Sequence, residues 1–345
     1  MVEDSSARRG GMRDVARVAG VSISTVANVL SRPAIVAPET RRRVQEAMAR
    51  VGYVRNGPAR VLRGVPSAIV GSVLLDLANP FYAQVNRGIE DRLTDQGCLV
   101  LAGSTDLDAA KERRLLGLLE EQAVRGVIVA PIDPDLTRLQ ELSRRGTPVV
   151  LVDHPRGRTD LCCVTVDDVL GGRLAAEHLL ALGHRRIAYL SGSVNAVSVK
   201  QRRAGMFQAL AAAGLDSDKA LLDVRMPIEP PELPPQAIEM ILNASPRPTA
   251  VLCVNDTVAL DVLRGLESVG VRVPADMSVV GYDDLQFAAR LSPSLTTVAQ
   301  PIYQLGYAAA DLLLDEARSD HTHREVLFQP SLVVRASTAV APADR

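Results

Sequence analysis

The chain has 345 residues and a net charge of −1, with 47% of its residues hydrophobic and 23% charged, so it can bury one large core or two of medium size. No run reaches the roughly 18 apolar residues of a membrane span, and the N-terminal stretch lacks the apolar segment of a signal peptide, so we expect a cytoplasmic protein. The four cysteines show no CxxC spacing, which predicts buried thiols with no metal, disulfide or cofactor.

Residues 12–53 predict three short helices. Apolar residues recur with i, i+3, i+4 spacing over 12–20, 22–32 and 38–53, so each helix is expected to bury one face. Gly20 is expected to end the first helix, and the small Ala16 and Gly20 let a second helix cross the first closely. This pattern is typical of a helix-turn-helix. A three-helix bundle with no partner is the alternative.

The charge of this head indicates a nucleic-acid partner. Between residues 11 and 64, ten arginines stand against three acidic residues and give a charge of +7, whereas residues 65–345 carry −8. A solvated helix face usually mixes both signs, whereas a compact basic head suits a polyanion because each neutralised phosphate releases counterions. We therefore expect double-stranded DNA as a partner.

The second predicted helix carries the candidate base-reading residues. In a helix-turn-helix this helix lies in the major groove with its first residues facing base edges, which here are Ile23, Ser24 and, one turn later, Asn28. Asparagine suits a bidentate contact with adenine, and Ile23 offers an apolar surface to a thymine methyl group. Ser22 is either a helix cap or a phosphate contact. For Ser24 and Asn28 the alternative is simple solvation.

After residue 66, short apolar runs alternate with amphipathic segments that often end at glycine. Runs buried on both faces are typical of parallel strands, and alternation with helices predicts right-handed βαβ units. About 275 residues are long for one such sheet, so the fold class is an all-α head followed by an α/β core of two doubly wound parallel-sheet lobes. The expected ligand site is the cleft between the lobes, at the carboxyl ends of the strands. The runs cover 68–77, 98–104, 126–132, 148–154, 186–193, 249–255 and 277–284.

Ten stretches of the chain share a family likeness. In order they are DVARVAGVSISTV, PETRRRVQEAMARVGYVRN, ARVLR, NPFYA, LVDHP, VTVDD, HLLALGHRRIAYLSG, VNDTVALDVLRGLESVG, VPADMSVVGYDD and LSPSLTTVAQP. Through them the chain resembles the LacI/GalR transcriptional regulators from about Met12 to about Ala336. The resemblance implies a repressor that binds a pseudo-palindromic operator as a homodimer and responds to a small effector. No leucine heptads follow residue 330, so we expect no coiled-coil tetramer.

The same resemblance implies the domain organisation. A disordered tail is expected over 1–10, the helix-turn-helix domain over 11–56, and a hinge helix with its linker over 57–66. The core over 67–345 is expected to be similar to type I periplasmic sugar-binding proteins. Its N-lobe is expected over about 67–166 and 296–326 and its C-lobe over about 167–294 and 327–340, with crossovers near 166, 295 and 326.

The resemblance also implies contacts with DNA. Ser22 and Thr25 match phosphate contacts, Tyr53 and Asn56 match residues near the DNA backbone, and Leu62 matches a leucine that wedges into the minor groove. Tyr53 as a packing residue and Leu62 as a core leucine are the alternatives. The family often has arginine or histidine where this chain has Asn28, and capping residues where it has Gly11 and Ala37. The implied DNA-binding residues are Ser22, Ile23, Ser24, Thr25, Asn28, Tyr53, Asn56, Arg60, Leu62 and Arg63.

Effector contacts are implied by the same resemblance, in part through the stretches above and, for Arg202, through KQRRAG. Carboxylates, an amide and a guanidinium at strand ends can bond several hydroxyls, which is the chemistry of a sugar or nucleoside site. For any single aspartate, helix capping or turn formation is the alternative. The proline-rich segment 225–240 stands where many relatives have a glycine-rich stretch with an aromatic residue that covers the ligand. We therefore expect no aromatic ring to stack on that side of the ligand. The implied residues are Phe81, Tyr82, Asp106, Asp153, Arg202, Asn255 and Asp283.

Other classes of protein fit the sequence less well. An α/β enzyme is the first, but the chain lacks GxGxxG after a strand, GxxxxGK[ST] and GxSxG, so no catalytic residue is predicted. A periplasmic solute-binding protein would need a signal peptide and would have no use for residues 12–64. Within the family, a corepressor-dependent repressor or an activator stays open, because the sign of the response depends on which lobe arrangement the ligand favours.

Overall fold

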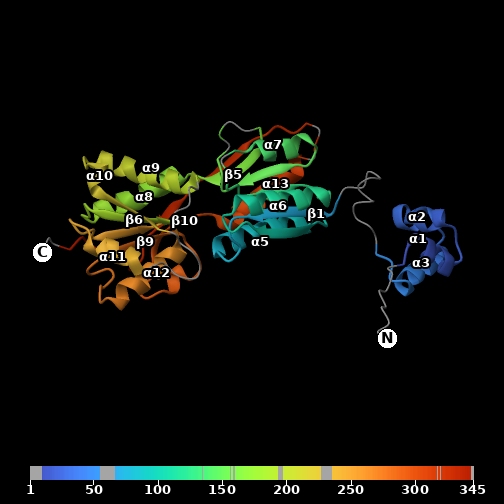
Figure 1. Ribbon diagram of the computed structural model, residues 1–345, viewed down its shortest axis with the longest axis horizontal. Helices are drawn as coiled ribbons and strands as arrows, with labels where there is room; N and C mark the ends of the chain where they lie inside the picture. The colour runs from blue at the N-terminus through green and yellow to red at the C-terminus, as the bar shows by residue number, and fades with distance from the viewer. Residues whose placement is uncertain are drawn as a thin grey trace. The chain divides into compact units, whose positions relative to one another are not determined.

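The computed structural model describes residues 10–54, 67–133, 135–155, 157, 160–192, 197–226, 235–316, 318 and 320–342. The chain divides into two compact units, Met1–Pro66 and Ser67–Arg345, which are shown in Figure 1. The predicted hinge and nearly all of the predicted tail lie outside the described residues. None of the described helices combines the length and the hydropathy needed to cross a bilayer.

The first unit is a small helical domain. Its helices are α1 (Met12–Ala19), α2 (Ile23–Ser31) and α3 (Pro38–Arg50), with a 3-10 turn, η1 (Pro33–Ile35), between the last two. The spacing of apolar residues predicted this core, and Leu30 and Met48 pack against it as expected. The fully buried members of the core are Val15, Ala16, Ala19, Val26, Val29, Val44 and Ala47.

Backbone and side-chain caps set the ends of these helices. Gly20 ends α1 in the left-handed conformation, with a φ of 63°, and its N–H donates to the carbonyls of Ala16 and Arg17, as predicted. The Ser22 Oγ accepts a bond from the N–H of Thr25 at 3.0 Å and caps α2. Ala37 offers no side-chain cap to α3, so that helix begins with its first N–H groups less well satisfied.

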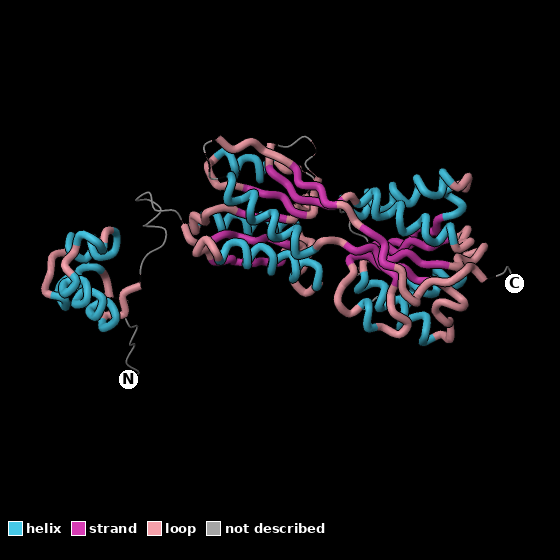
Figure 2. Tube along the Cα trace, turned by 180° about the vertical axis from the view of Figure 1, so that it is seen from behind, coloured by secondary structure: helices cyan, strands magenta, loops and turns pink. Residues whose placement is uncertain are grey.

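The second unit holds two six-stranded sheets, and helices cover both faces of each one (Figures 1 and 2). In the first sheet every neighbouring pair is parallel, in the order β11-β5-β4-β3-β1-β2. Helices α5 (Pro80–Thr94) and α13 (Ile302–Glu316) pack on one face, and α6 (Ala109–Glu121) and α7 (Thr137–Arg144) on the other. The strands are β1 (Ile69–Leu74), β2 (Leu99–Ser104), β3 (Val127–Val129), β4 (Val149–Val152), β5 (Cys162–Val166) and β11 (Glu325–Phe328).

The second sheet has the order β12-β10-β9-β8-β6-β7, and only β12, which pairs with β10, is antiparallel to its neighbour. Helices α8 (Asp168–Ala181) and α9 (Val197–Ala212) pack on one face, and α11 (Pro235–Asn243) and α12 (Asp256–Ser268) on the other. The short α10 (Ser217–Ala220) precedes β7, and the 3-10 turn η2 (Ala288–Arg290) follows β9. The strands are β6 (Ile187–Gly192), β7 (Leu221–Met226), β8 (Ala250–Cys253), β9 (Ser278–Asp283), β10 (Thr296–Ala299) and β12 (Ser331–Val333).

Two of the three crossovers between the lobes lie later in the chain than predicted. Strand β10 pairs with β9 in the second sheet, so the chain returns to the first lobe after Ala299 and not near residue 295. Strand β11 stays paired with β5 as far as Phe328, so the last crossover follows residue 328 and not 326. The predicted boundaries, about 296 and 326, fall a few residues early because these short strands lie at the crossovers, where an apolar pattern does not tell which sheet a strand joins.

Glycines allow the closest helix contacts in both lobes. A Cβ atom at Gly306 of α13 would lie 1.9 Å from the carbonyl oxygen of Val85 in α5, and one at Gly205 of α9 would lie 1.9 Å from that of Val169 in α8. Any other residue would force these helices apart. The contact between α8 and α9 also fixes the position of Arg202 relative to the start of α8.

Candidate functional sites

The exposed face of α2 carries the predicted base-reading side chains. Ile23 is 43% exposed, and Ser24 and Asn28 are also exposed, whereas Val26 and Val29 are buried. Ser24 and Asn28 stand four residues apart and therefore share one helix face. An exposed isoleucine at the first position of this helix contributes little to the core and is available for an apolar contact.

Hydroxyl groups gather at the amino end of α2. The Ser22 Oγ lies 2.7 Å from the Ser24 Oγ and 2.8 Å from the Thr25 Oγ1. Ser22 caps the helix, which was one of its two predicted roles and is compatible with the other. A helix N-terminus with clustered hydroxyls is suited to a phosphate group.

Several arginines of the head have partners within the head. Arg42 pairs with Glu39 at 2.6 Å and with Glu46 at 2.8 Å, and Arg43 donates to the Ala19 carbonyl at the end of α1. Arg42 therefore pairs within α3 itself, whereas Arg43 ties α3 to the end of α1, and the excess of positive charge remains.

The remaining predicted DNA contacts fall into two groups. Tyr53 packs against the core of the head, which was the alternative role given to it. Asn56, Arg60, Leu62 and Arg63 lie outside the described residues.

In the second unit, three of the predicted effector aspartates sit on unusual backbone. Asp106 follows β2, Asp153 follows β4 and Asp283 ends β9, with φ angles of 52°, 56° and 113°. Residues with a side chain rarely adopt this region, and such strain is concentrated at functional sites. In a parallel sheet the carboxyl ends of the strands share one edge, so the three residues mark that edge in both lobes.

Arg202 lies at the centre of a buried charge network. It is 6% exposed, its Nε donates to the Asp168 Oδ1 at 2.7 Å, and its Nη1 donates to the Val254 carbonyl at 2.6 Å. The guanidinium carbon lies 3.6 Å from the centre of the Tyr282 ring, and the Tyr282 hydroxyl donates to the same Asp168 oxygen at 3.0 Å. A buried ion pair needs such additional bonds to offset its desolvation, so Arg202 first holds Asp168 in place.

Asp153 and Asp283 extend this network. The Tyr82 hydroxyl donates to the Asp153 Oδ2 at 2.8 Å, and the Gln300 Nε2 donates to the Asp283 Oδ1 at 2.7 Å. Burial raises the pKa of Asp153 to about 7, reinforced by the charge of Asp168 and opposed by Arg202. Burial also raises the pKa of Asp283 well above its usual value, again opposed by Arg202. Hydrogen-bond donors of a ligand would favour the ionised form of both carboxyls.

The other predicted effector residues have different surroundings. Phe81 is buried beside Tyr82, with ring centres 4.9 Å apart. The Asn255 Oδ1 accepts a bond from the N–H of Val258 at 2.8 Å and caps α12. Helix capping was the alternative role given for polar residues in these loops. Asp106 is exposed and pairs with Lys111. The structure thus brings together Tyr82, Asp153, Arg202 and Asp283.

Sequence reasoning missed three residues that support this network, namely Asp168, Tyr282 and Gln300. It also missed Asp256, which is fully buried and accepts bonds from the Thr297 Oγ1 at 2.6 Å and the Leu285 N–H at 2.7 Å. All four lie in or beside the family stretches VTVDD, GYDD, VAQP and VND. Their presence there was the only signal, and it did not separate them from capping residues.

Comparisons with known proteins cover both units. Residues 11–56 match the model of bacterial regulatory proteins, lacI family, and residues 176–338 match a periplasmic binding protein-like domain. The chain is 33% identical over 334 residues to the HTH-type transcriptional regulator DegA of Bacillus subtilis (strain 168), covering 94% of this chain and 97% of that protein.

Solved structures of lacI-family regulators also resemble this chain. The lac repressor dimer bound to operator and the anti-inducer ONPF is 30% identical with a TM-score of 0.79, covering 96% of this chain and 100% of that one. A LacI family transcriptional regulator from Enterococcus faecium with bound ribose is 30% identical with a TM-score of 0.71, covering 79% and 100%. These matches confirm the expected fold, a helix-turn-helix domain followed by two parallel-sheet lobes.

Proposed function

Since this chain belongs to the lacI family of bacterial regulatory proteins, we propose that it represses transcription and that a small polar ligand, bound between the lobes, changes its affinity for operator DNA. The observation that carries the proposal is the buried network around Arg202. Arg202 bonds to Asp168 of the second lobe, and its charge acts on Asp153, at the end of a strand in the first lobe, and on Asp283 in the second. A ligand that bonds to both lobes favours one arrangement of them over another.

The chemistry of the network supports a ligand rich in hydrogen-bond donors. The charges of three carboxyl groups, those of Asp153, Asp168 and Asp283, act on one guanidinium. Its Nε and Nη1 already donate to protein oxygens. Acceptor oxygens therefore outnumber free donors at this site. A sugar or a nucleoside supplies several hydroxyl donors, and the related regulator with bound ribose supports that class.

Two copies of the chain would bind DNA together. A two-fold axis relates two heads to two half-sites of a pseudo-palindrome, and each head would contact DNA through Ser22, Ile23, Ser24, Thr25 and Asn28. The edge strand β2 exposes Leu99 and Leu101, which are 71% and 48% exposed and lie on one face of the strand. A second copy would cover this apolar edge. We place the protein in the cytoplasm, where it would bind its ligand without converting it.

A thermal-shift screen of sugars and nucleosides tests the ligand site. A ligand at 100 times its dissociation constant adds about 2.7 kcal/mol of stability, so the unfolding midpoint should rise by several degrees. Asp283→Asn should remove the shift because it replaces one acceptor oxygen of the carboxyl group with an NH2 donor. Asp284→Asn is the matched control, since Asp284 is the next residue but pairs with Arg335 at 2.6 Å, and it should retain the shift. If no compound stabilises the wild type, or if both variants respond as the wild type does, the effector site lies elsewhere.

A further inference from the structure

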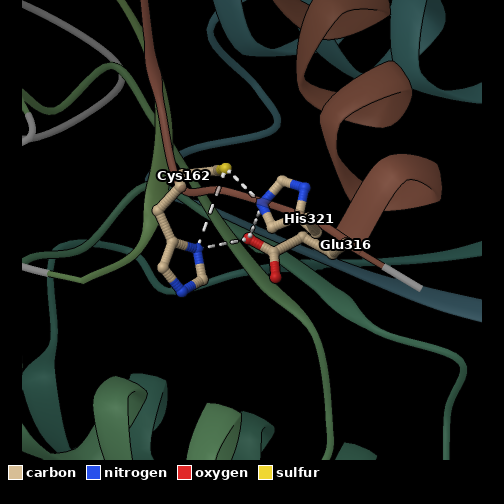
Figure 3. Close-up of side chains that lie close together, drawn as sticks. Cys162, Glu316 and His321 are labelled. Atoms are coloured by element: carbon tan, nitrogen blue, oxygen red, sulfur yellow. Dashed lines mark hydrogen bonds and ion pairs between the residues drawn. The ribbon is translucent and has the colours of Figure 1, made fainter. Parts of the chain in front are cut away.

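Four metal-ligating side chains lie together in the first lobe. Cys162 begins β5, Glu316 ends α13, and His321 and His323 lie between α13 and β11. Their ligating atoms are all within 4.8 Å of one another, and Figure 3 shows Cys162, Glu316 and His321 pointing toward one another. The cluster lies at the amino end of β5, whereas the Arg202 network lies at the carboxyl ends of the strands. The two sites are therefore separate.

Four distances between these atoms lie between 3.1 and 4.0 Å, close to the edges of a tetrahedron around a metal ion. The Cys162 Sγ is 3.1 Å from the His321 Nε2 and 4.0 Å from the His323 Nδ1. The Glu316 Oε1 is 3.3 Å and 3.1 Å from the same two nitrogens. Around a tetrahedral Zn²⁺, with bonds of about 2.3 Å to sulfur and about 2.0–2.1 Å to nitrogen and oxygen, neighbouring ligand atoms are about 3.3–3.6 Å apart.

We propose that Cys162, Glu316, His321 and His323 bind one Zn²⁺ ion. A thiolate and two imidazoles are ligands for zinc, whereas Mg²⁺ and Ca²⁺ take sites made of oxygen atoms. Four protein ligands complete the tetrahedral shell, and a closed shell is typical of a structural site. The ion ties the start of β5 to the end of α13 and to the segment that leads into β11.

Burial supports this assignment. Cys162 is fully buried, and the side chains of Glu316 and His321 are 7% and 6% exposed. A divalent cation at the centre of the cluster offsets the charge of the buried Glu316 carboxylate.

The residues around the cluster also resemble the outer shell of a metal site. The His321 Nδ1, the ring nitrogen that faces away from Cys162, lies 3.4 Å from the Asp315 Oδ2. A carboxylate at this place fixes the orientation and tautomer of a metal-binding histidine. The N–H of Arg324 donates to the Cys162 sulfur at 3.4 Å, and a thiolate sulfur can accept such a hydrogen bond. A hydrogen-bonded cluster with no metal is the alternative that the experiment must exclude.

The test uses the untagged full-length chain, stripped with a chelator and then titrated with Zn²⁺ and, separately, with Co²⁺. We expect one equivalent per chain, a thiolate-to-cobalt charge-transfer band, and a higher unfolding midpoint in Zn²⁺ than in Mg²⁺. Cys162→Ala should remove the band and weaken zinc binding more than Asp315→Asn does. The loss expected for Asp315→Asn is about 10–100-fold, as for other outer-shell changes.

Cys163→Ala is the matched control. Cys163 is also buried, but it packs on the opposite face of β5 from Cys162, so this variant should keep the band and the affinity. His323→Asn is a second ligand variant, and because its side chain is 32% exposed it tests the site without opening a core cavity. Absence of zinc uptake by the wild type, or equal affinity in the wild type, Cys162→Ala and His323→Asn, would overturn the proposal.

Discussion

Among single residues, Asn28 is the one at which we expect base preference to change most. Its side chain is exposed on α2, and asparagine pairs with adenine through two hydrogen bonds. Asn28→Ala should cost roughly 1–3 kcal/mol and relax the preference at one base pair of each half-site. Arg41→Ala, which changes a charge on α3, should instead weaken all sequences alike. If selection from random duplexes gives Asn28→Ala the wild-type base preference, Asn28 does not read bases.

Asp256 is a residue that makes stability depend on pH. Burial raises its pKa to about 7, although bonds from Thr297 and Leu285 oppose the shift. In the unfolded chain the pKa of an aspartate is about 3.9. Between these two values the folded protein holds a proton that the unfolded chain has released. The stability that this group contributes is therefore present at low pH and is lost as the pH rises toward 7.

Asp256→Asn should remove this dependence. The amide is similar in shape and does not titrate, so the decrease in unfolding free energy from pH 5 to pH 8 should be smaller in the variant by roughly 1–3 kcal/mol. Urea unfolding at one protein concentration measures the difference, and the fixed concentration keeps any contribution from association constant. An equal decrease in both proteins would show that Asp256 keeps an ordinary pKa.

At the scale of helices, the head contains one helix with a side-chain cap and one without. Ser22 caps α2 through the N–H of Thr25, whereas Ala37 precedes α3 without a side-chain cap and with extended backbone, its ψ being 138°. Ser22→Ala should cost about 1 kcal/mol, and Ala37→Ser should add about 0.5–1 kcal/mol. Hydrogen exchange of amides in residues 10–54 reports both changes. Unchanged exchange in α3 of Ala37→Ser would mean that this missing cap does not limit the stability of the head.

The strands differ in how well the sequence predicts them. The apolar runs coincide with β1, β2, β3, β4, β6, β8 and β9. Strands covered on both faces leave such a continuous apolar signal, but the apolar run of β2 lies on an edge strand that exposes Leu99 and Leu101. Strand β7 carries Asp223 and Arg225 and lacks that signal. Strands β10 and β11 lie at the crossovers, where only the three-dimensional pairing assigns them to a lobe.

The candidate sites likewise contain some residues that the sequence predicts and others that it does not. Asp153, Arg202 and Asp283 were predicted from the family resemblance, whereas Asp168 was not. Asp168 follows Asp167 directly, and Asp167 caps α8 while Asp168 binds Arg202. The sequence alone does not show which of two adjacent aspartates is the helix cap and which binds the arginine. The cluster of Cys162, Glu316 and the two histidines was missed because its members come together only when β5 and β11 pair.

At the scale of the whole molecule, a ligand acts on DNA binding only through its different affinities for two arrangements of the protein. Couplings of this kind are typically 1–3 kcal/mol, or about 5–150-fold in affinity. The Arg202 network contains groups from both lobes, so a ligand bonded to it has contacts that depend on how the lobes are arranged.

The most direct measurement is a titration of operator binding with and without the ligand found in the thermal-shift screen. The operator is first selected from random duplex DNA, and we expect the enriched sequence to be pseudo-palindromic.

The ligand should then change the affinity of the wild type by about 5–150-fold, a decrease identifying an inducer and an increase a corepressor. Asp283→Asn should bind the operator as the wild type does without ligand and should show no response to it, whereas Asp284→Asn should respond normally. Failure to enrich any palindromic sequence, or an operator affinity unchanged by a ligand that stabilises the protein, would contradict the proposal that this chain is a ligand-controlled repressor.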